Sequence, residues 1–343
     1  MLILRYSSRR SKIRDVRRYK NLSKVILSVS KKTGIPTKKI SDFFYYIRKG
    51  EPVDNNLSIQ ELGLSRNSLN QAKEILSSYL LPPSKNTQLK AKVVNEVKDF
   101  FSRGYLPDGA MWNFLKTRQY RETLEFIRQK VSSRPNPERK FDQFFATTQT
   151  TAKRACLMDY LADIEGKRIL FLGDDDFTSV AVANFHTASE VSVMEIDERI
   201  RNGIFSVSKK EGLGIKLFDY DARKAFPASQ LKRYDIVFTD PPYTEKGVQL
   251  FTSRAIEALD SSNHSARIYV CYGSSDSAKE KFLEIYDIFA KSRLMLRFIF
   301  DKFNRYKGAE SIGDSSSLFI ADVTANTKPI ITGKHDKKIY THN

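Results

Sequence analysis

The chain has 343 residues, of which 41% are hydrophobic and 29% charged, and its formal net charge is +18. This composition is typical of a globular protein of two or three domains and excludes wholesale disorder. No apolar run reaches the roughly 18 residues of a membrane-spanning helix, so we expect no membrane partner. Two cysteines, Cys156 and Cys271, are too few for a disulfide framework. They fit a reducing compartment, and we expect a cytoplasmic protein.

The first twenty residues form a basic arm. Residues 1–20 contain six Arg and two Lys against Asp15 alone, a net charge of +7. Such an arm is typical of nucleic-acid binding, although an organelle transit peptide or a solvated basic terminus has the same composition. We therefore retain nucleic acid as a partner that the N-terminal region could bind.

Residues 21–104 are predicted to form a small helical domain. Apolar residues recur at helical spacing in two segments that each end at a glycine. Ser58 and Ser65 are then placed as N-caps of two short helices joined at Gly63. This outline of a helix-turn-helix predicts a winged-helix-like domain that contacts DNA or serves for packing and dimerisation, so a homodimer is a second partner to consider.

Beyond this domain the pattern changes. Residues 105–160 are expected to form a connecting helical region, whereas residues 161–324 alternate strands with helices. Strands are expected at "RILFLG", "EVSVMEID", "GIKLFDYD", "YDIVFTD", "ARIYVCYG", "LMLRFIF" and "SSLFIADV". This alternation predicts an α/β domain whose mostly parallel sheet is covered on both faces and ends in an antiparallel edge. Residues 325–343, with four lysines, are expected to be a mobile basic tail.

Acidic residues follow the carboxyl ends of the first four predicted strands, the edge at which open α/β sheets bind ligands. Glu195 comes about 20 residues after the first turn and is placed to accept hydrogen bonds from a ribose diol. Asp221 follows the third strand and is placed to meet an adenine amino group. Such acids also cap helices, as Asp197 could do for the helix that follows it. Because the acids follow four strands in register, we favour a nucleoside site.

The turn after the first strand is unusual, because Gly173 is followed by Asp174, Asp175 and Asp176. A carboxylate cluster repels the α-carboxylate of an amino acid and attracts ammonium groups, so it favours a ligand with amines and no carboxylate. Adjacent acids also raise one another's pKa, which suits a base that deprotonates an ammonium. Asp-rich turns bind Mg²⁺ as well, but we expect no metal here.

The loop after the fourth strand, "FTDPPYTEKG", is the most specific motif. Its two prolines lack backbone N–H donors and fix φ, which leaves the carbonyl of Asp240 or Pro241 free to accept from a ligand amine. The Asp240 carboxylate can accept from the same nitrogen, and Tyr243 could stack on it. The loop therefore suits a nucleophilic nitrogen that is held for alkyl transfer, with Tyr306 of "FNRY" as a further residue that could line the pocket.

Taken together, these segments resemble the branched-chain polyamine synthases, the N4-bis(aminopropyl)spermidine synthase family. The matching segments are "FDQ", "LGDDDFTSVA", "IDER", "DARKAFP", "TDPPYT", "SRAIEAL" and "FNRY", within about residues 140–322. The resemblance implies a Rossmann-like catalytic domain of the class I methyltransferase and spermidine-synthase type. It further implies transfer of an aminopropyl group from decarboxylated S-adenosylmethionine to a secondary amine of spermidine or a related polyamine, with release of methylthioadenosine.

The resemblance also implies roles for particular residues. Asp176 would lie beside the attacking amine and assist its deprotonation, and Asp240 with neighbouring acids such as Asp197 would hold the polyamine. Gln143 could close over the donor. In-line alignment of nitrogen, carbon and sulfur would supply most of the catalysis.

Two alternatives remain open on the residues. Archaeal members of the family carry Glu after the two prolines, where this chain has Tyr243, so the loop also resembles that of an amino-methyltransferase. An S-adenosylmethionine-dependent N-methyltransferase acting on DNA or RNA is therefore one alternative, and the basic arm is consistent with it. The other is a winged-helix DNA-binding protein whose nucleoside domain senses a ligand.

Overall fold

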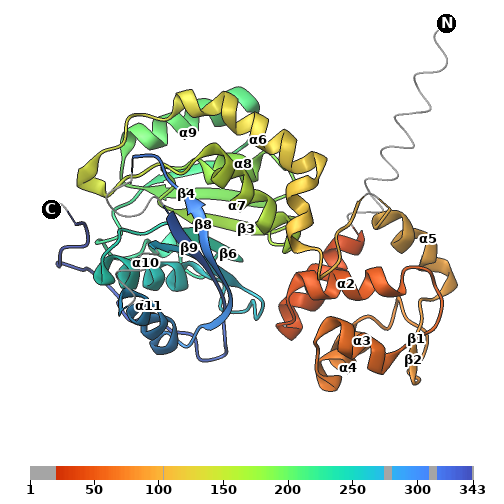
Figure 1. Ribbon diagram of the computed structural model, residues 1–343. Coiled ribbons are helices and arrows are strands. Elements are labelled where there is room, and N and C mark those ends of the chain that lie inside the picture. Colours follow the sequence, from red (N-terminus) through yellow and green to blue (C-terminus); the bar gives the residue numbers. More distant parts are fainter. Residues whose placement is uncertain (1–20, 103, 274–279, 309–314, 342–343) are drawn as a thin grey trace, which may run out of the picture. The chain divides into compact units, whose positions relative to one another are not determined.

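The computed structural model describes residues 21–102, 104–273, 280–308 and 315–341, and the expected basic arm lies outside them. The chain divides into two compact units that we describe separately (Figure 1). The N-terminal unit comprises Met1–Asn113 and Tyr160–Ala162, and the sheet unit comprises Phe114–Asp159 and Asp163–Asn343. No helix in the described ranges is long and apolar enough to cross a membrane.

The N-terminal unit is mainly helical, as its apolar periodicity predicts. A helix over residues 21–33 is followed by α2 (Thr37–Ile47), α3 (Asn55–Leu62), α4 (Arg66–Ile75) and α5 (Ala91–Phe100). Between them, β1 (Val53–Asp54) pairs antiparallel with β2 (Asn86–Thr87), and Leu80 bridges to Leu89. Phe43, Phe44 and Leu69 lie in its buried core. Helices interrupted by short paired strands are compatible with the winged-helix prediction, which stays a prediction.

The two predicted N-caps have different outcomes. Ser65 caps α4, since its hydroxyl accepts from the Ser68 backbone N–H at 3.1 Å. Ser58 was the wrong choice for α3, because Asp54 precedes that helix in an extended conformation and its carboxylate accepts from the backbone N–H groups of Asn56 and Leu57. Ser58 lies inside α3 and donates to the Asp54 carbonyl. A carboxylate at the helix start also complements the helix dipole, which favours Asp54 as the cap.

The sheet unit contains a seven-stranded sheet in the described residues, with strand order β5-β4-β3-β6-β7-β9-β8. Its strands are β3 (Arg168–Leu172), β4 (Glu190–Glu195), β5 (Lys216–Asp219), β6 (Ile236–Thr239), β7 (Arg267–Gly273), β8 (Met295–Arg305) and β9 (Ser315–Asp322). β5, β4, β3, β6 and β7 are parallel to one another, and β9 runs antiparallel to both β7 and β8. All seven predicted strands are therefore present, with the predicted antiparallel edge.

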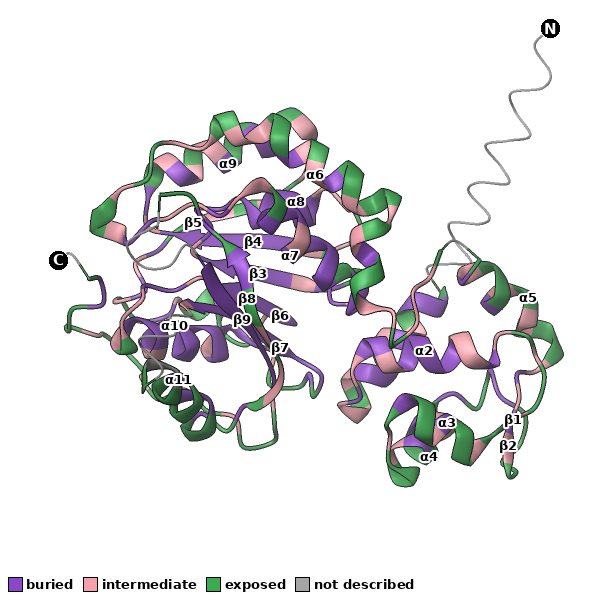
Figure 2. Ribbon diagram, in the orientation of Figure 1, coloured by how far each residue is buried: buried purple, intermediate pink, exposed green. Residues whose placement is uncertain are grey.

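Helices cover both faces of this sheet. They are α6 (Arg118–Lys130), α7 (Thr148–Tyr160), α8 (Thr178–Ala183), α9 (Glu198–Glu211), α10 (Glu245–Ala258) and α11 (Glu280–Lys291). Figure 1 shows α7, α8 and α9 on one side of the sheet and α10 and α11 on the other. The central strands are buried almost throughout, whereas α9 and α11 expose their outer faces (Figure 2). The order reverses between β3 and β6, so the carboxyl ends of these two strands face a shared crevice.

The C-terminal segment differs from the mobile tail that its lysines suggested. Ile339 and Tyr340 are buried, and the Ile339 carbonyl accepts from the Thr244 hydroxyl at 2.7 Å. The Thr341 hydroxyl and backbone N–H both donate to the Asp142 carboxylate. The sequence pattern missed this docking because Ile339 and Tyr340 follow a lysine-rich stretch, and their partners are distant in the chain.

Candidate active site

A pocket opens at the carboxyl ends of the parallel strands, where the sequence predicted a nucleoside site. It encloses about 690 Å³ of space, including the part open to solvent. Its lining comprises Phe141, Asp142, Gln143, Phe144, Leu172, Gly173, Asp174, Asp175, Met194, Glu195, Ile196, Tyr220, Ala222, Asp240, Pro241, Pro242, Tyr243, Phe251, Tyr306 and Tyr340. The lining therefore combines acids with aromatic rings, and it contains no Lys, Arg or His from the described residues.

Gly173 begins the acidic turn in a conformation that suits glycine. Its φ is +72°, in the left-handed region that residues with a Cβ rarely adopt. Its N–H donates to the Met194 carbonyl at 2.8 Å, which continues the pairing of β3 with β4. The chain then turns sharply into the short helix α8, and the three aspartates leave the turn in different directions.

Asp174 serves α8. Its two carboxylate oxygens accept from the backbone N–H groups of Thr178 at 2.8 Å and Ser179 at 3.0 Å. Burial nevertheless raises the pKa of Asp174 to about 7, although these hydrogen bonds oppose the shift. Asp174 thus holds the turn and the start of α8 in place while one side of it lines the pocket.

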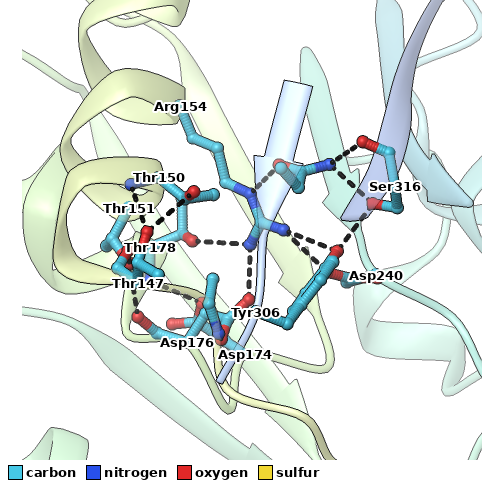
Figure 3. A network of polar contacts seen from close by, with 12 residues as sticks. Thr147, Thr150, Thr151, Arg154, Asp174, Asp176, Thr178, Asp240, Tyr306 and Ser316 are labelled. Carbon is cyan, nitrogen blue, oxygen red and sulfur yellow. Dashed lines mark hydrogen bonds and ion pairs between the residues drawn. The ribbon is translucent and has the colours of Figure 1, made fainter. Parts of the chain in front are cut away.

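Asp176 and Asp240 are joined by Arg154, a residue that no sequence motif indicated (Figure 3). The Arg154 guanidinium donates through Nη1 to Asp176 Oδ2 at 2.6 Å and through Nη2 to Asp240 Oδ2 at 2.7 Å. Asp176 Oδ1 accepts from the backbone N–H of Ala146. Both oxygens of Asp176 therefore have partners within the protein, and Asp176 does not line the pocket.

The antiparallel edge of the sheet fixes the other side of Arg154. Arg154 Nε donates to Asn304 Oδ1 at 2.8 Å, and Asn304 donates to the Ser316 hydroxyl at 2.8 Å. The Tyr306 hydroxyl accepts from Arg154 Nη2 at 3.1 Å and donates to Asp240 Oδ2 at 2.7 Å. Helix α7, the end of β6, β8 and β9 thus meet at one guanidinium, as Figure 3 shows. Five donors in a rigid plane explain why Arg occupies this position.

Asp175 is different from its two neighbours. It lines the pocket, and it accepts no hydrogen bond and meets no ion-pair partner among the residues that the structure describes. Burial raises its pKa well above the ordinary value, and the carboxylates of Asp176, Asp240 and Glu195 add to the shift. Of the three adjacent acids, Asp175 is therefore the one whose carboxylate is available to a ligand.

The acids after β4 and β5 are only partly brought together, although Glu195 and Asp221 were predicted at the donor and Asp197 at the polyamine. Glu195 lines the pocket, and its carboxylate accepts from the backbone N–H groups of Asp174 at 3.0 Å and Asp197 at 2.8 Å. Burial raises the pKa of Glu195. Asp197 lies outside the lining, where it caps α9 and accepts from Gln143 Nε2 at 3.1 Å. Asp221 also lies outside the lining, because the Arg223 guanidinium and backbone N–H occupy its carboxylate.

The loop after β6 supplies an aromatic wall. Pro241, Pro242 and Tyr243 all line the pocket, and the Tyr243 ring makes edge-type contact with Tyr306 at 6.5 Å between centroids. Tyr272 lies 6.2 Å from Tyr243 on the other side. Aromatic faces beside carboxylates attract ammonium groups, both by charge and through the ring quadrupole. The loop is therefore compatible with the amine site that its sequence predicted.

Sequence reasoning missed Arg154 and Tyr340. Arg154 is 1% exposed on a helix whose neighbouring residues Ala152, Ala155 and Leu157 are also buried, so a lone charge on an apolar helix face was the available signal. Tyr340 contacts Phe141 edge to face, with 6.0 Å between centroids, and both line the pocket. No local pattern connects the end of the chain with "FDQ", since the contact depends on the folded tail.

The strand order and the acid-rich pocket at the switch point define a Rossmann-like domain of the class I methyltransferase and spermidine-synthase type. The family model of the branched-chain polyamine synthase A C-terminal domain matches residues 122–342. The chain belongs to this family.

The chain also matches individual relatives, one of them named as a bis(aminopropyl)spermidine synthase. The chain is 38% identical over 222 residues to an uncharacterised protein of Methanocaldococcus jannaschii, covering 65% of this chain and 55% of that protein. It is 32% identical over 189 residues to the N(4)-bis(aminopropyl)spermidine synthase of Thermococcus kodakarensis, covering 54% and 53%. The chain thus spans about half the length of the curated relatives it matches.

A solved structure supports the fold. The branched-chain polyamine synthase from Thermus thermophilus, in complex with N4-aminopropylspermidine and 5'-methylthioadenosine, matches with a TM-score of 0.59. The match covers 93% of this chain and 97% of that one, at 19% identity. The similarity therefore extends over both units of the chain.

Proposed function

We propose that the protein transfers aminopropyl groups from decarboxylated S-adenosylmethionine to a secondary amine of spermidine or a related polyamine. The observation that carries this proposal is the lining of the pocket, which has five acids and no basic side chain in the described residues. A donor with a carboxylate would find no cation to bind it, whereas an aminopropyl chain and a polyamine both carry ammonium groups. The names of the curated relatives support the same reaction.

The donor nucleoside is proposed to lie between Glu195 and the rings of Phe141 and Tyr340. Glu195 ends β4, where an acid accepts hydrogen bonds from a ribose diol. Gly173 leaves space beside it, because the nearest atoms to a Cβ built there are 3.8 Å away, on Glu195 and Phe251. The methylthioadenosine in the Thermus relative is consistent with a nucleoside product.

The acceptor is proposed to lie along the loop after β6. Asp240 and the Pro241 carbonyl accept from its amines, and the rings of Tyr243 and Tyr306 contact its methylene and ammonium groups. Burial raises the pKa of Asp240, while the Arg154 cation opposes the shift. A carboxylate in this half-buried position interacts with a cation more strongly than it would in water.

A direct assay tests the reaction. Purified protein is given spermidine with either decarboxylated S-adenosylmethionine or S-adenosylmethionine, and methylthioadenosine and the polyamine product are measured by mass spectrometry. We expect methylthioadenosine and a branched polyamine with the decarboxylated donor, loss of product in Asp240→Asn, and full activity in Asp287→Asn, an exposed carboxylate of α11. Absence of methylthioadenosine across a panel of amines would exclude the proposal.

Methyl transfer to nucleic acid is the competing reaction, and Tyr243 is the residue that favours it. It requires a site for the donor's α-carboxylate, and the acids of the pocket oppose both that group and the phosphates of a nucleic-acid substrate. In calorimetry, tighter binding of S-adenosylmethionine than of its decarboxylated form would favour methylation.

The N-terminal unit is proposed to contact nucleic acid. Residues 1–113 have 22 basic and nine acidic residues, a net charge of +13. The outer face of α4 exposes Asn67, Asn70 and Gln71, side chains that can pair with adenine edges in the major groove. Fluorescence anisotropy with duplex DNA should show binding that weakens steeply from 50 to 200 mM salt, and no binding at low salt would refute it. A homodimer is also expected, and analytical ultracentrifugation would test for it.

A further inference from the structure

Helix α10 contains the segment "SRAIEAL", none of whose residues lines the pocket. Its first two residues, Ser253 and Arg254, are polar, yet both side chains are fully buried. Burial of a guanidinium costs free energy unless its N–H donors find acceptors. The hydrogen bonds of Arg254 therefore show which parts of the protein this helix holds in place.

Arg254 makes one ion pair and contacts two backbone carbonyls. Its Nη1 donates to Glu257 Oε2 at 2.8 Å, within α10. Its Nε donates to the Ala222 carbonyl at 2.9 Å, and its Nη2 donates to the Gly333 carbonyl. One carbonyl precedes α10 in the chain and the other follows it, so a single side chain holds two separate segments against the same helix.

The first carbonyl belongs to the turn after β5. Tyr220 and Ala222 line the pocket, and the Tyr220 backbone N–H donates to the Glu195 carbonyl at 3.2 Å. The turn therefore lies beside the acid that is proposed to bind the ribose. By holding the Ala222 carbonyl, Arg254 fixes this part of the pocket wall from outside the pocket.

The second carbonyl belongs to the C-terminal segment, where that segment contacts α10. The Ser253 hydroxyl, next to Arg254, accepts from the backbone N–H groups of Ile330 at 3.2 Å and Ile331 at 3.1 Å. Two adjacent side chains of α10 thus hold the beginning of the segment that leads to Tyr340.

The two segments also contact each other. The His335 backbone N–H donates to the Arg223 carbonyl at 2.8 Å, and the Arg223 guanidinium carbon lies 5.9 Å from the centre of the Tyr340 ring. Tyr340 in turn contacts Phe141 and lines the pocket. The position of the Tyr340 ring relative to the turn after β5 therefore depends on how both segments are held at α10.

We propose that Arg254 is a positioning residue for the donor, because it sets the spacing between the turn after β5 and the C-terminal segment, between which the nucleoside binds. The inference rests on the proposed function. Arg254 does not line the pocket, so it acts through the Ala222 and Gly333 carbonyls. A planar guanidinium directs its donors along fixed directions and reaches both carbonyls at once, whereas the ammonium of a lysine is a point charge on a flexible stem.

A purely structural role would have a different consequence. If Arg254 served only as the buried partner of Glu257, its replacement would lower stability without a selective effect on one substrate. Its hydrogen bonds reach none of the residues that are proposed to hold the acceptor, Asp240, Pro241 and Tyr243. Loss of positioning should therefore weaken binding of the donor and leave binding of the acceptor unchanged.

Arg254→Lys tests this role, because it keeps a cation beside Glu257 and loses the paired carbonyl contacts. Its affinity for methylthioadenosine in calorimetry should fall about tenfold, and the KM for decarboxylated S-adenosylmethionine should rise by about the same factor. The kcat and the KM for spermidine should stay within about twofold of the wild-type values, since the lost interaction binds substrate and transition state alike.

Two control variants separate positioning from stability. Glu257→Gln removes the ion pair and leaves both carbonyl contacts, so it should lower the thermal unfolding temperature with nearly unchanged methylthioadenosine affinity. Arg233→Met removes a partly exposed Arg–Glu pair with Glu190, which begins β4 at the sheet edge opposite the pocket, and should leave the affinity unchanged.

Ser253→Ala is a second test that does not depend on the folding of Arg254→Lys. It removes the acceptor of the Ile330 and Ile331 N–H groups and leaves the guanidinium contacts, so methylthioadenosine affinity should fall about threefold. Unchanged affinity in either Ser253→Ala or folded Arg254→Lys, or an equal loss in Glu257→Gln, would overturn the inference.

The same measurements distinguish this inference from the proposed function. If the wild-type protein binds methylthioadenosine but forms none from the decarboxylated donor and any amine, the proposed function fails, and the affinities of the variants still decide the role of Arg254. A wild-type protein that binds no methylthioadenosine would refute both.

Discussion

Both units of the chain bury an ion pair beside aromatic rings, but only one of the two is balanced. In the N-terminal unit, Lys38 lies 2.5 Å from Asp42, and the Tyr105 hydroxyl donates to the same carboxylate at 2.8 Å. One cation forms an ion pair with one anion there, and the Asp108 carboxylate also interacts with both. In the sheet unit, Arg154 meets both Asp176 and Asp240, so the acids outnumber the cation even before Asp175 is counted. Balanced burial is typical of structure, whereas an unbalanced cluster in a pocket indicates chemistry.

The two units also differ in net charge, and most of the positive charge belongs to the N-terminal unit. Residues 1–113 have a net charge of +13, and residues 114–343, with 36 basic and 31 acidic residues, have +5. The basic excess, which repels polycationic substrates at long range, therefore belongs mainly to the unit without the pocket. A local acidic pocket governs binding within about 8 to 10 Å, since salt screens more distant charges.

The largest expected effect comes from breaking the unbalanced cluster. Arg154→Met leaves two buried carboxylates without their cation, so we expect a loss of about 3 to 5 kcal/mol in the free energy of unfolding, measured by urea titration. Arg118→Met, which removes an exposed partner of Glu122 on α6, should have no measurable effect. Equal stability of the two variants would show that the cluster is not held by its arginine.

Removing both partners of the Lys38–Asp42 pair should destabilise the protein less than removing Lys38 alone. Burial lowers the pKa of Lys38 and raises that of Asp42, so each partner incurs a desolvation cost that the other only partly offsets. Lys38→Met alone should cost about 3 kcal/mol, because Asp42 stays buried without its cation. The double variant Lys38→Met/Asp42→Asn should recover most of that loss in a double-mutant cycle. If the losses of unfolding free energy from the two single substitutions simply added in the double variant, the two side chains would not form a balanced pair.

A smaller effect is expected at the wall of the pocket. Tyr340→Ala removes one ring from the proposed nucleoside site, so affinity for methylthioadenosine should fall about tenfold in calorimetry, or about 1.4 kcal/mol. Tyr340→Phe should retain the affinity, and Lys338→Ala, an exposed neighbour, serves as the control. Unchanged affinity in Tyr340→Ala would place the nucleoside elsewhere in the pocket.

Local patterns predicted much of the fold. Short apolar runs, separated by helical segments, marked all seven strands of the sheet, and the residues that end β3, β4 and β6 placed Gly173, Glu195 and Asp240 at one edge. Local patterns failed where two candidates of the same kind competed. Ser58 and Asp54 both suit an N-cap, and only the backbone conformation that follows decides between them.

The sequence by itself determined the class of the sheet, the position of the acidic turn at its carboxyl edge and the family, because period, turn chemistry and motif are local properties. Tertiary structure alone decided that Asp176 is turned away from the pocket, since that depends on Arg154, which lies more than twenty positions before Asp176 and more than eighty before Asp240. It also brought Tyr340 to Phe141. Charge pairing and ring contact depend on distance in space, and chain order does not encode that distance until the sheet and its helices pack.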